Sequence, residues 1–238
     1  MNQIKKQKIA LIIPVFNEEG SIGKVIADIP KIIVDEIIVV DNGSTDKSPK
    51  TAKALGATVL SQHIRGYGAA CLKGIDYLES QSPQPDLLVF IDGDYSDYPE
   101  ETKNLVEKVN EGYDFVLGSR VLGIEYFDAH LSSHSVLGNK LAAFFLNYLF
   151  RGNYTDLGPF RVIKFDKLLQ LRMADMNYGW TMEMQIKALR HKLKICEIPV
   201  KYRERFAGES KVTGTFWGSL KAFIKITYIV ILYFLRIK

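Results

Sequence analysis

Two aspartates, Asp92 and Asp94, stand one residue apart directly after an apolar run at residues 87–91. A short apolar run with β-branched members between turn formers is typical of a strand buried on both faces. The carboxyl end of such a strand lies at the rim of a parallel sheet, where α/β proteins bind ligands. Two carboxylates there are costly unless a cation holds them, and Gly93 leaves room for a ligand beside the backbone. Such hard oxygen ligands suit Mg2+ or Mn2+, with positions left open for substrate phosphates. A strand followed by an ordinary acidic turn would have the same sequence pattern. The other motifs in the chain must therefore distinguish a metal site from such a turn.

Other predicted strands also end in polar residues. These are Pro14, Asn17 and Glu18 after residues 9–15, Asp41 after residues 36–40, and Arg120 after residues 113–117. Carboxylates can accept hydrogen bonds from a base or ribose, and an arginine can meet a phosphate. Together with a metal at Asp92 and Asp94, this set suits a nucleotide diphosphate. A Walker phosphate loop is absent, and the glycines around Gly66 match a dinucleotide fingerprint only in part, which indicates a tight strand-to-helix turn.

The apolar runs alternate with helical patterns along the first half of the chain. We expect strands at 9–15, 36–40, 57–61, 87–91 and 113–117, and helices at 21–29, 46–55, 69–78 and 99–111. This βαβ spacing predicts a mainly parallel, doubly wound sheet. Residues 121–135 then form a predicted long loop, of a length that is usually functional or mobile. We expect further helices at 136–150, 165–171, 180–190 and 216–235, and a strand at 193–200. A polar loop at 154–161 is expected to lead into a short strand just before the helix at 165–171.

The composition is that of one large globular α/β domain, with 238 residues, 47% hydrophobic and 24% charged. Cys71 and Cys196 lack metal-ligand spacing and are expected to be reduced thiols in a cytosolic protein. We expect no secretory signal ahead of the first strand. The net charge of +4 is uneven, because residues 201–238 alone have a net charge of +6. This basic end suggests an anionic surface or ligand there.

A series of motifs between residues 11 and about 211 resembles one enzyme family. The motifs are I-I-P-V-F-N-E, V-V-D-N-G-S-T-D, R-G-Y-G-A-A, F-I-D-G-D-Y-S-D-Y-P-E-E, L-G-S-R, T-D-L-G-P-F-R and G-W-T-M-E-M-Q. In this order they are similar to family 2 glycosyltransferases of the GT-A fold, and among these to dolichyl- and polyprenyl-phosphate mannose and glucose synthases. The resemblance implies a GT-A, Rossmann-like sheet sandwiched by helices, with a catalytic domain at residues 1–211 and a membrane-associating helix within residues 212–238. It implies an inverting, metal-dependent hexosyltransferase that uses Mg2+ or Mn2+ and a nucleotide diphosphate sugar.

The resemblance also assigns roles to residues. Nucleotide-sugar binding falls to Pro14, Phe16, Asn17, Glu18, Asp41, Gly66, Asp92, Gly93 and Arg120; metal binding to Asp92 and Asp94; catalysis to Asp94, Asp156 and Glu183; and acceptor-phosphate binding to Arg161, Arg203, Arg205, Ser210 and Lys211. Two departures bear on the donor. Mannose synthases commonly have a glutamine near the metal where this chain has Ser96, which favours a UDP-sugar over GDP-mannose. Ile64 replaces an asparagine of the usual pattern and removes a polar contact near the base.

Three acids in this set have simpler explanations. Asp41 could cap a turn, Asp156 could pair with Arg161, and Glu183 could form a helical ion pair with Lys187 at i+4. If the acceptor is a polyprenyl phosphate, its oxygen is already anionic and needs no strong base. If the acceptor is a glycan or lipid hydroxyl, Asp156 or Glu183 must act as the base. The alternative outside enzymology is a nucleotide-sugar-binding membrane scaffold, which would not need the metal site, Arg120 and Asp156 together.

The last predicted helix and the basic segment before it indicate where in the cell the protein would act. Residues 226–235 carry no charge, but a stretch of ~20 residues that could span a bilayer must include Lys221 and Lys225. We therefore expect a peripheral or monotopic helix on the cytoplasmic side of the membrane, with a core or dimer helix as the alternative. Alternation places Lys201, Arg203 and Arg205 on one side of an extended segment, either as a phosphate clamp or as a basic strand near anionic lipid. The expected partners are the nucleotide sugar, the lipid phosphate and the membrane surface, without nucleic acid; a homo-oligomer is compatible with the sequence.

Overall fold

The predicted apolar runs form one seven-stranded sheet in the computed structural model, which describes residues 7–122, 133–207 and 216–235, with only the backbone at 133–137 and 216–223. The strands are β1 (Ile9–Val15), β2 (Glu36–Asp41), β3 (Thr58–Ser61), β4 (Leu87–Phe90), β5 (Phe115–Ser119), β6 (Arg161–Lys164) and β7 (Ile195–Pro199). Their spatial order is β3-β2-β1-β4-β6-β5-β7. All described pairs are parallel except those of β6, which runs antiparallel to both β4 and β5. The prediction of an α/β fold with a mainly parallel sheet is confirmed.

The helices follow the predicted order. They are α1 (Ile22–Asp28), α2 (Ser48–Ala54), α3 (Tyr67–Glu79), α4 (Thr102–Asn110, after a 3-10 turn at Pro99–Glu101), α5 (Ser133–Phe150), α6 (Phe165–Leu171), α7 (Trp180–Arg190) and α8 (Phe216–Leu235). The predicted loop at 121–135 falls largely outside the described residues, and its last three positions belong to α5.

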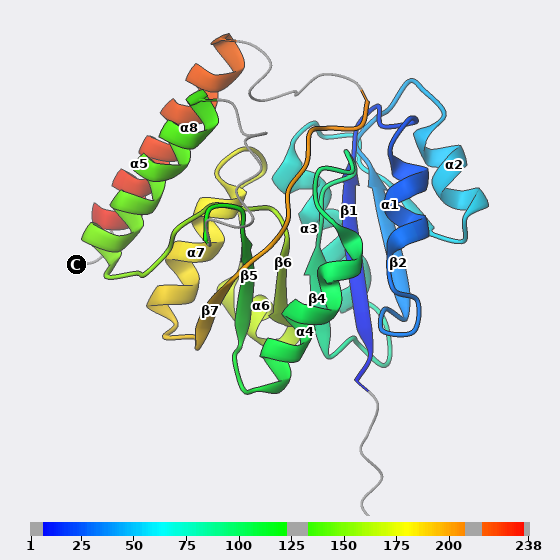
Figure 1. Ribbon diagram of the computed structural model, residues 1–238, viewed down its shortest axis with the longest axis horizontal. Helices are drawn as coiled ribbons and strands as arrows, with labels where there is room; N and C mark the ends of the chain where they lie inside the picture. The colour runs from blue at the N-terminus through cyan, green and yellow to red at the C-terminus, as the bar shows by residue number, and fades with distance from the viewer. Residues whose placement is uncertain (1–6, 123–132, 208–215, 236–238) are drawn as a thin grey trace, which may run out of the picture.

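The sheet separates two apolar cores, and β1 contributes to both because successive side chains of a strand point to opposite faces. Leu11 and Ile13 pack with residues of α1, α2 and α4 on one face. Ala10 and Ile12 pack on the other face with residues of α3, α6 and α7. A strand buried on both faces has no polar position except at its ends, so the polar chemistry collects at the sheet's edges. The carboxyl ends of β1, β2, β4 and β5 form one edge, uppermost in Figure 1.

Helices α5 and α8 lie side by side at one end of the molecule, next to α7 (Figure 1). Their inner residues, among them Leu146, Ile229 and Val230, are buried in the same core as α7. Within the part of the chain that the structure describes, no helix combines the length and apolarity needed to cross a membrane.

Candidate active site

The loop after β1 lies against the loop after β2 because the two strands pair in register up to Val15 and Asp41. Asn17 accepts a hydrogen bond from the Thr45 amide (2.8 Å) and donates its own amide to Ser44 Oγ (2.9 Å). Asp41 accepts one from the Ser44 amide (2.9 Å), as a turn-capping residue would. These predicted nucleotide-binding residues therefore meet at one place, and their hydrogen bonds fix the shape of the paired loops.

Two residues that were not singled out complete this end of the site. Asn42 Nδ2 donates to the carbonyls of Gln62 (3.0 Å) and Ile64 (2.7 Å), and Asn42 Oδ1 accepts from the Gly66 amide (2.8 Å). The loop so fixed places the Arg65 guanidinium 3.6 Å from the centre of the Phe16 ring. An aromatic ring and a guanidinium plane both present flat surfaces on which a nucleobase can stack.

Gly66 owes its identity to close packing. A Cβ there would lie 2.0 Å from the Met176 carbonyl, and φ is +147°. Gly68 is equally close to the Asp175 carbonyl. The predicted tight turn is therefore present, pressed against residues 175–177. Packing at Gly93 is less strict, because a Cβ at this position would lie 3.1 Å from Val15 Cγ2 and the valine would need to shift only slightly.

Asp92 and Asp94 lie at the carboxyl end of β4, as predicted. Asp92 Oδ1 is buried and has no hydrogen-bond partner among the described residues, while the Tyr67 hydroxyl donates to the Asp92 carboxylate. Burial, reinforced by the charge of Asp94, raises the pKa of Asp92 to about 7. Asp94 accepts a hydrogen bond from the Ser96 amide (2.9 Å) through Oδ1. A buried oxygen without a partner beside a second carboxylate fits a cation.

Asp92 and Asp94 would leave coordination positions of a bound metal ion open for substrate oxygens. Over the residues that the structure describes, no third acidic, histidine or cysteine side chain joins Asp92 and Asp94 in a group that could hold a metal ion. Mg2+ and Mn2+ are commonly bound by one or two carboxylates and complete their coordination with substrate phosphates and water. The residues present therefore fit a divalent cation that arrives with a diphosphate.

Asp97, three residues further on, was missed as a candidate. It is 2% exposed, and neither carboxylate oxygen has a hydrogen-bond partner among the described residues. Burial, together with the charges of Asp92 and Asp94, raises its pKa well above the usual range, while Arg120 acts in the opposite direction. The D-Y-S-D run, which begins at the predicted metal ligand Asp94, was the signal that could have identified it.

Arg120 and Asp156 form a buried bidentate ion pair. Arg120 Nε donates to Asp156 Oδ2 (2.7 Å) and Arg120 Nη2 to Oδ1 (2.8 Å). The backbone amides of Arg120 (3.0 Å) and Leu157 (2.7 Å) also donate to this carboxylate. Burial alone would raise the pKa of Asp156, but the charge and hydrogen bonds of Arg120 outweigh it, so this pKa is lowered. Asp156 therefore has Arg120, and not Arg161, as its partner, and both of its oxygens are occupied.

Arg161 does not face the surface. It is 1% exposed, donates to the carbonyl of Gly158, and stands opposite Phe90 and Leu117 in the antiparallel ladders of β6. The sequence placed it in a polar loop, whereas it begins a central strand whose neighbours bury it. This placement gives no support to the prediction that Arg161 binds an acceptor phosphate.

Glu183 is buried within a network that joins α7 to α8. Its carboxylate accepts hydrogen bonds from Tyr233 Oη (2.7 Å) and from the amides of Ala174 (3.1 Å) and Asp175 (2.7 Å), and it pairs with Lys187 Nζ (2.8 Å). Burial acts to raise the pKa of Glu183, but these hydrogen bonds, that of Lys187 first, outweigh it and lower the pKa. The geometry favours the i+4 ion pair left open by the sequence over a role as a base.

The basic segment after β7 approaches the acidic edge. The Arg203 guanidinium lies 3.4 Å from the ring centre of Tyr95 and 4.1 Å from that of Tyr98. Arg205 bridges Glu18 Oε1 (2.6 Å) and Asp94 Oδ2 (3.0 Å). Both predicted phosphate ligands thus have partners within the chain, and those of Arg205 are two acids predicted to bind the nucleotide sugar and the metal. Ser210 and Lys211 lie outside the described residues.

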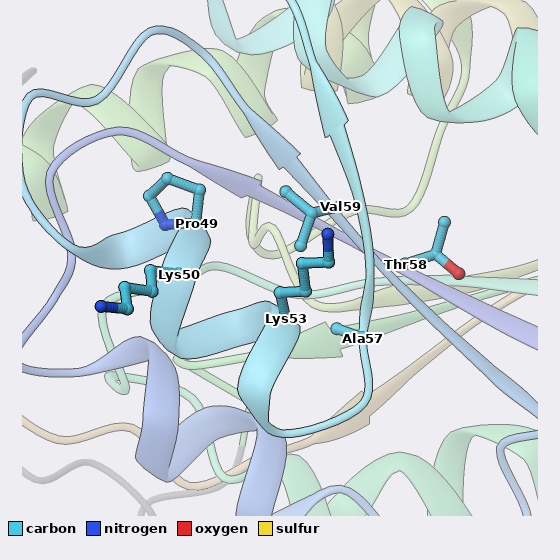
Figure 2. Close-up of a pocket in the computed structure, with 6 residues that line it drawn as sticks. All are labelled: Pro49, Lys50, Lys53, Ala57, Thr58 and Val59. Atoms are coloured by element: carbon cyan, nitrogen blue, oxygen red, sulfur yellow. The ribbon is translucent and has the colours of Figure 1, made fainter.

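A shallow pocket elsewhere lies between α2 and β3 (Figure 2). It is lined by Pro49, Lys50, Lys53, Ala57, Thr58 and Val59. Thr58 begins β3, the edge strand of the sheet, so this pocket opens at the opposite end of the strand from the carboxyl edge. None of the predicted site residues lines it.

Comparison with known proteins shows the family. The chain is 31% identical over 218 residues to an uncharacterized glycosyltransferase of Mycobacterium tuberculosis, covering 91% of this chain and 94% of the relative. It is 31% identical over 217 residues to the dolichyl-phosphate hexose transferase of Haloferax volcanii, covering 89% and 90%. Among solved structures, glucosyl-3-phosphoglycerate synthase from M. tuberculosis, in complex with Mn2+, UDP and glucosyl-3-phosphoglycerate, has a TM-score of 0.74 at 22% identity, covering 95% of this chain and 80% of that one. The shared fold is GT-A. The family model described as Glycosyl transferase family 2 matches residues 10–170, and the chain therefore belongs to glycosyltransferase family 2.

Proposed function

We propose that this chain is an inverting, metal-dependent hexosyltransferase that moves a sugar from a nucleotide diphosphate sugar to a polyprenyl or dolichyl phosphate. A UDP-sugar is the favoured donor and GDP-mannose is the alternative. The observation that carries the proposal is the pair Asp92 and Asp94, with the unpartnered Asp92 Oδ1, at the carboxyl end of a central strand of a family 2 chain. The structural neighbour with the same fold has been solved with UDP and either Mn2+ or Mg2+.

The site has two ends, one that would bind the base and ribose of the nucleotide sugar and one that would bind its diphosphate. Phe16 and Arg65 offer flat surfaces to the base, and the loops after β1 and β2 offer polar groups to the ribose. Asp92 and Asp94 would hold a divalent cation, which supplies positive charge to the leaving diphosphate. Arg120 is held rigid by Asp156, so its charge is fixed near the reacting end without loss of side-chain entropy on binding.

A phosphate acceptor agrees with the state of the two predicted bases. Asp156 is bound by Arg120, and Glu183 by Lys187 and Tyr233, so neither carboxylate is free to take a proton from a hydroxyl. A phosphate oxygen is already anionic and attacks without such a base. The relative in H. volcanii, whose name specifies dolichyl phosphate, supports the same acceptor class.

A lipid acceptor also agrees with the outer face of α5 and α8. Large apolar side chains are exposed there: Phe144 and Tyr148 on α5, and Ile224, Tyr228, Ile231, Phe234 and Leu235 on α8. The positions on α8 recur at helical spacing, which places them on one face. Neither helix contains an acidic residue, and together they contain Lys140, Lys221 and Lys225. Apolar faces of this size with only positive charge suit the cytoplasmic surface of an anionic membrane.

Transfer of radiolabelled sugar tests the proposal directly. The full chain is assayed with a panel of UDP- and GDP-sugars against polyprenyl phosphate, polyprenol and 3-phosphoglycerate, with Mg2+, Mn2+ or EDTA. We expect transfer to polyprenyl phosphate only, abolished by EDTA and by Asp94→Ala. Asp76→Ala, which removes an exposed carboxylate from α3, serves as the matched control and should be fully active. Transfer that persists in EDTA would contradict the proposed metal dependence. Transfer to polyprenol would contradict the proposed phosphate acceptor.

A further inference from the structure

Residues 202–207, the strap, cross the acidic edge of the sheet after leaving β7 (Figure 1, orange). The strap is hydrogen-bonded along the backbone that follows Asp94. The Arg203 amide donates to the Ser96 carbonyl (2.9 Å), the Phe206 amide donates to the Asp94 carbonyl (3.2 Å), and Tyr202 forms an isolated bridge with Asp97. These hydrogen bonds and the bridge hold the strap against the backbone of residues 94–97.

Arg203 anchors the strap without facing the donor site. Its guanidinium is enclosed by the rings of Tyr95 and Tyr98, and it donates to the carbonyls of Tyr95 (2.7 Å) and Asp97 (3.3 Å). These contacts involve two aromatic rings and two of its nitrogen donors. Arg205, two residues on, is held by a different kind of contact.

Arg205 is paired only with acids of the donor site in its described ion pairs. One nitrogen lies 2.6 Å from Glu18 Oε1 and the other lies 3.0 Å from Asp94 Oδ2. Its side chain is 21% exposed, so solvent screens the pair only in part. Glu18 and Asp94 contact the guanidinium directly, and the charge of Asp92 also acts on it.

A divalent cation between Asp92 and Asp94 would approach the carboxylate that Arg205 already neutralises through Oδ2. The other oxygen, Oδ1, already accepts the Ser96 amide. Mg2+ binds carboxylate oxygens at about 2.1 Å, so a metal on Oδ2 would lie within a few ångström of the guanidinium, where two positive charges repel strongly. The metal and Arg205 would therefore compete for Asp94.

We propose that Arg205 is a built-in counter-cation of the donor site, which the metal must displace from Asp94. The inference rests on the proposed function, because it requires a metal–diphosphate donor. A free metal ion would bind weakly, since it must break the ion pairs of Arg205. A metal that arrives with a diphosphate would bind well, because the diphosphate gives the displaced guanidinium a new anionic partner. Metal binding is thereby coupled to donor binding, and movement of Arg205 is coupled to the strap.

Binding of Mn2+ to the full chain, followed by the electron paramagnetic resonance signal of the free ion, tests this. The titration is made with Mn2+ alone and then with UDP present. Without UDP, Arg205→Gln should bind Mn2+ roughly tenfold more tightly than the wild type, as expected for release of a partly buried ion pair. With UDP, the advantage should vanish or reverse, because the variant cannot contact the diphosphate. Arg205→Lys, which keeps the charge but cannot bridge both acids, should lie between the two.

Lys53→Gln, beside the pocket of Figure 2, controls for the change in net charge and should match the wild type. A thermal melt of each variant checks that the fold is intact. Equal Mn2+ affinity of wild type and Arg205→Gln without UDP would overturn the counter-cation role and leave the proposed function standing. Absence of Mn2+ binding in every protein, with or without UDP, would overturn both.

Discussion

Arg120 and Asp156 lie 36 residues apart in the sequence and meet through two parallel hydrogen bonds of 2.7 and 2.8 Å. Asp156 also accepts the Arg120 amide, so one carboxylate fixes both the backbone and the side chain of the arginine. Asp156 therefore positions the guanidinium of Arg120, a role different from that of a proton acceptor.

Asp156→Asn should therefore leave a buried arginine without its counter-charge. We expect a loss of about 3 kcal/mol in the free energy of unfolding at pH 7. The pKa of Asp156 is lowered by folding, so its contribution is present above the unfolded value of 3.8 and is lost as the pH falls through the lower folded value. Urea unfolding at pH 7 and pH 3 should show the gap between wild type and variant shrinking in acid. Asp114→Asn, which breaks the more exposed pair with Lys164, should cost less; an equal cost would contradict the burial argument.

Asp97→Asn should have the opposite pH dependence. Burial raises the pKa of Asp97, so its contribution to stability is fully present below the unfolded value of 3.8 and is lost as the pH rises through the folded value. The variant does not titrate at this position, and without metal we expect it to exceed the wild type in unfolding free energy by on the order of 2 kcal/mol at pH 8. At pH 4.5 the difference should be small. Parallel pH profiles for the two proteins would show that Asp97 is not buried without a partner.

Glu183→Gln should separate helix docking from catalysis. The change weakens the contacts that join Glu183 to Tyr233 and Lys187, and we expect a loss on the order of 2 kcal/mol in stability. Tyr233→Phe removes the hydroxyl from the same contact and is the matched variant. If Glu183 holds α8, both variants should speed protease cleavage near α8 and both should keep kcat within a few-fold. A loss of kcat confined to Glu183→Gln would instead mark it as a base.

The exposed face of α8 predicts binding to anionic vesicles. Tyr228→Glu and Ile231→Glu each put a negative charge into that face and should reduce co-flotation with phosphatidylglycerol vesicles severalfold. Ile32→Glu is the control, since Ile32 is 85% exposed but lies apart from α5 and α8. Flotation that is unchanged by the α8 variants would leave the face to another copy of the chain, which analytical ultracentrifugation would reveal as a dimer broken by the same changes.

Local patterns in the sequence were sufficient for the elements and for the polar residues at the strand ends. Asp41 and Asp92 follow apolar runs directly, and Asp94 and Arg120 come three residues after one. Their position at one edge therefore needs only the parallel arrangement of the strands. Arg161 needed more, because its burial depends on a short strand inserted antiparallel between β4 and β5. No local periodicity specifies that insertion.

The interaction partners of the charged residues could not be predicted from local sequence patterns for the same reason. Glu18 and Arg205 are 187 residues apart, and their contact depends on where the chain returns after the last strand. Asn42 and Arg65 act through a loop whose course is set by packing against residues 175–177. Such pairings are properties of the assembled sheet rather than of any segment.

The loop at residues 174–177 touches both ends of the molecule. Glu183 receives its amides, and Tyr233 and Lys225 of α8 bind Glu183 and Asp175. The carbonyl of Met176 meanwhile accepts the Ala69 amide (2.9 Å) at the start of α3, beside the glycines that shape the nucleotide loop. A chain shortened before α8 would lose the contacts of Lys225 with Asp175 and of Tyr233 with Glu183. We therefore expect it to bind a nucleotide more weakly even where no membrane is present. A displacement of α8, such as one caused by binding to a bilayer, would therefore be transmitted through residues 174–177 to the turn at Gly66 and Gly68.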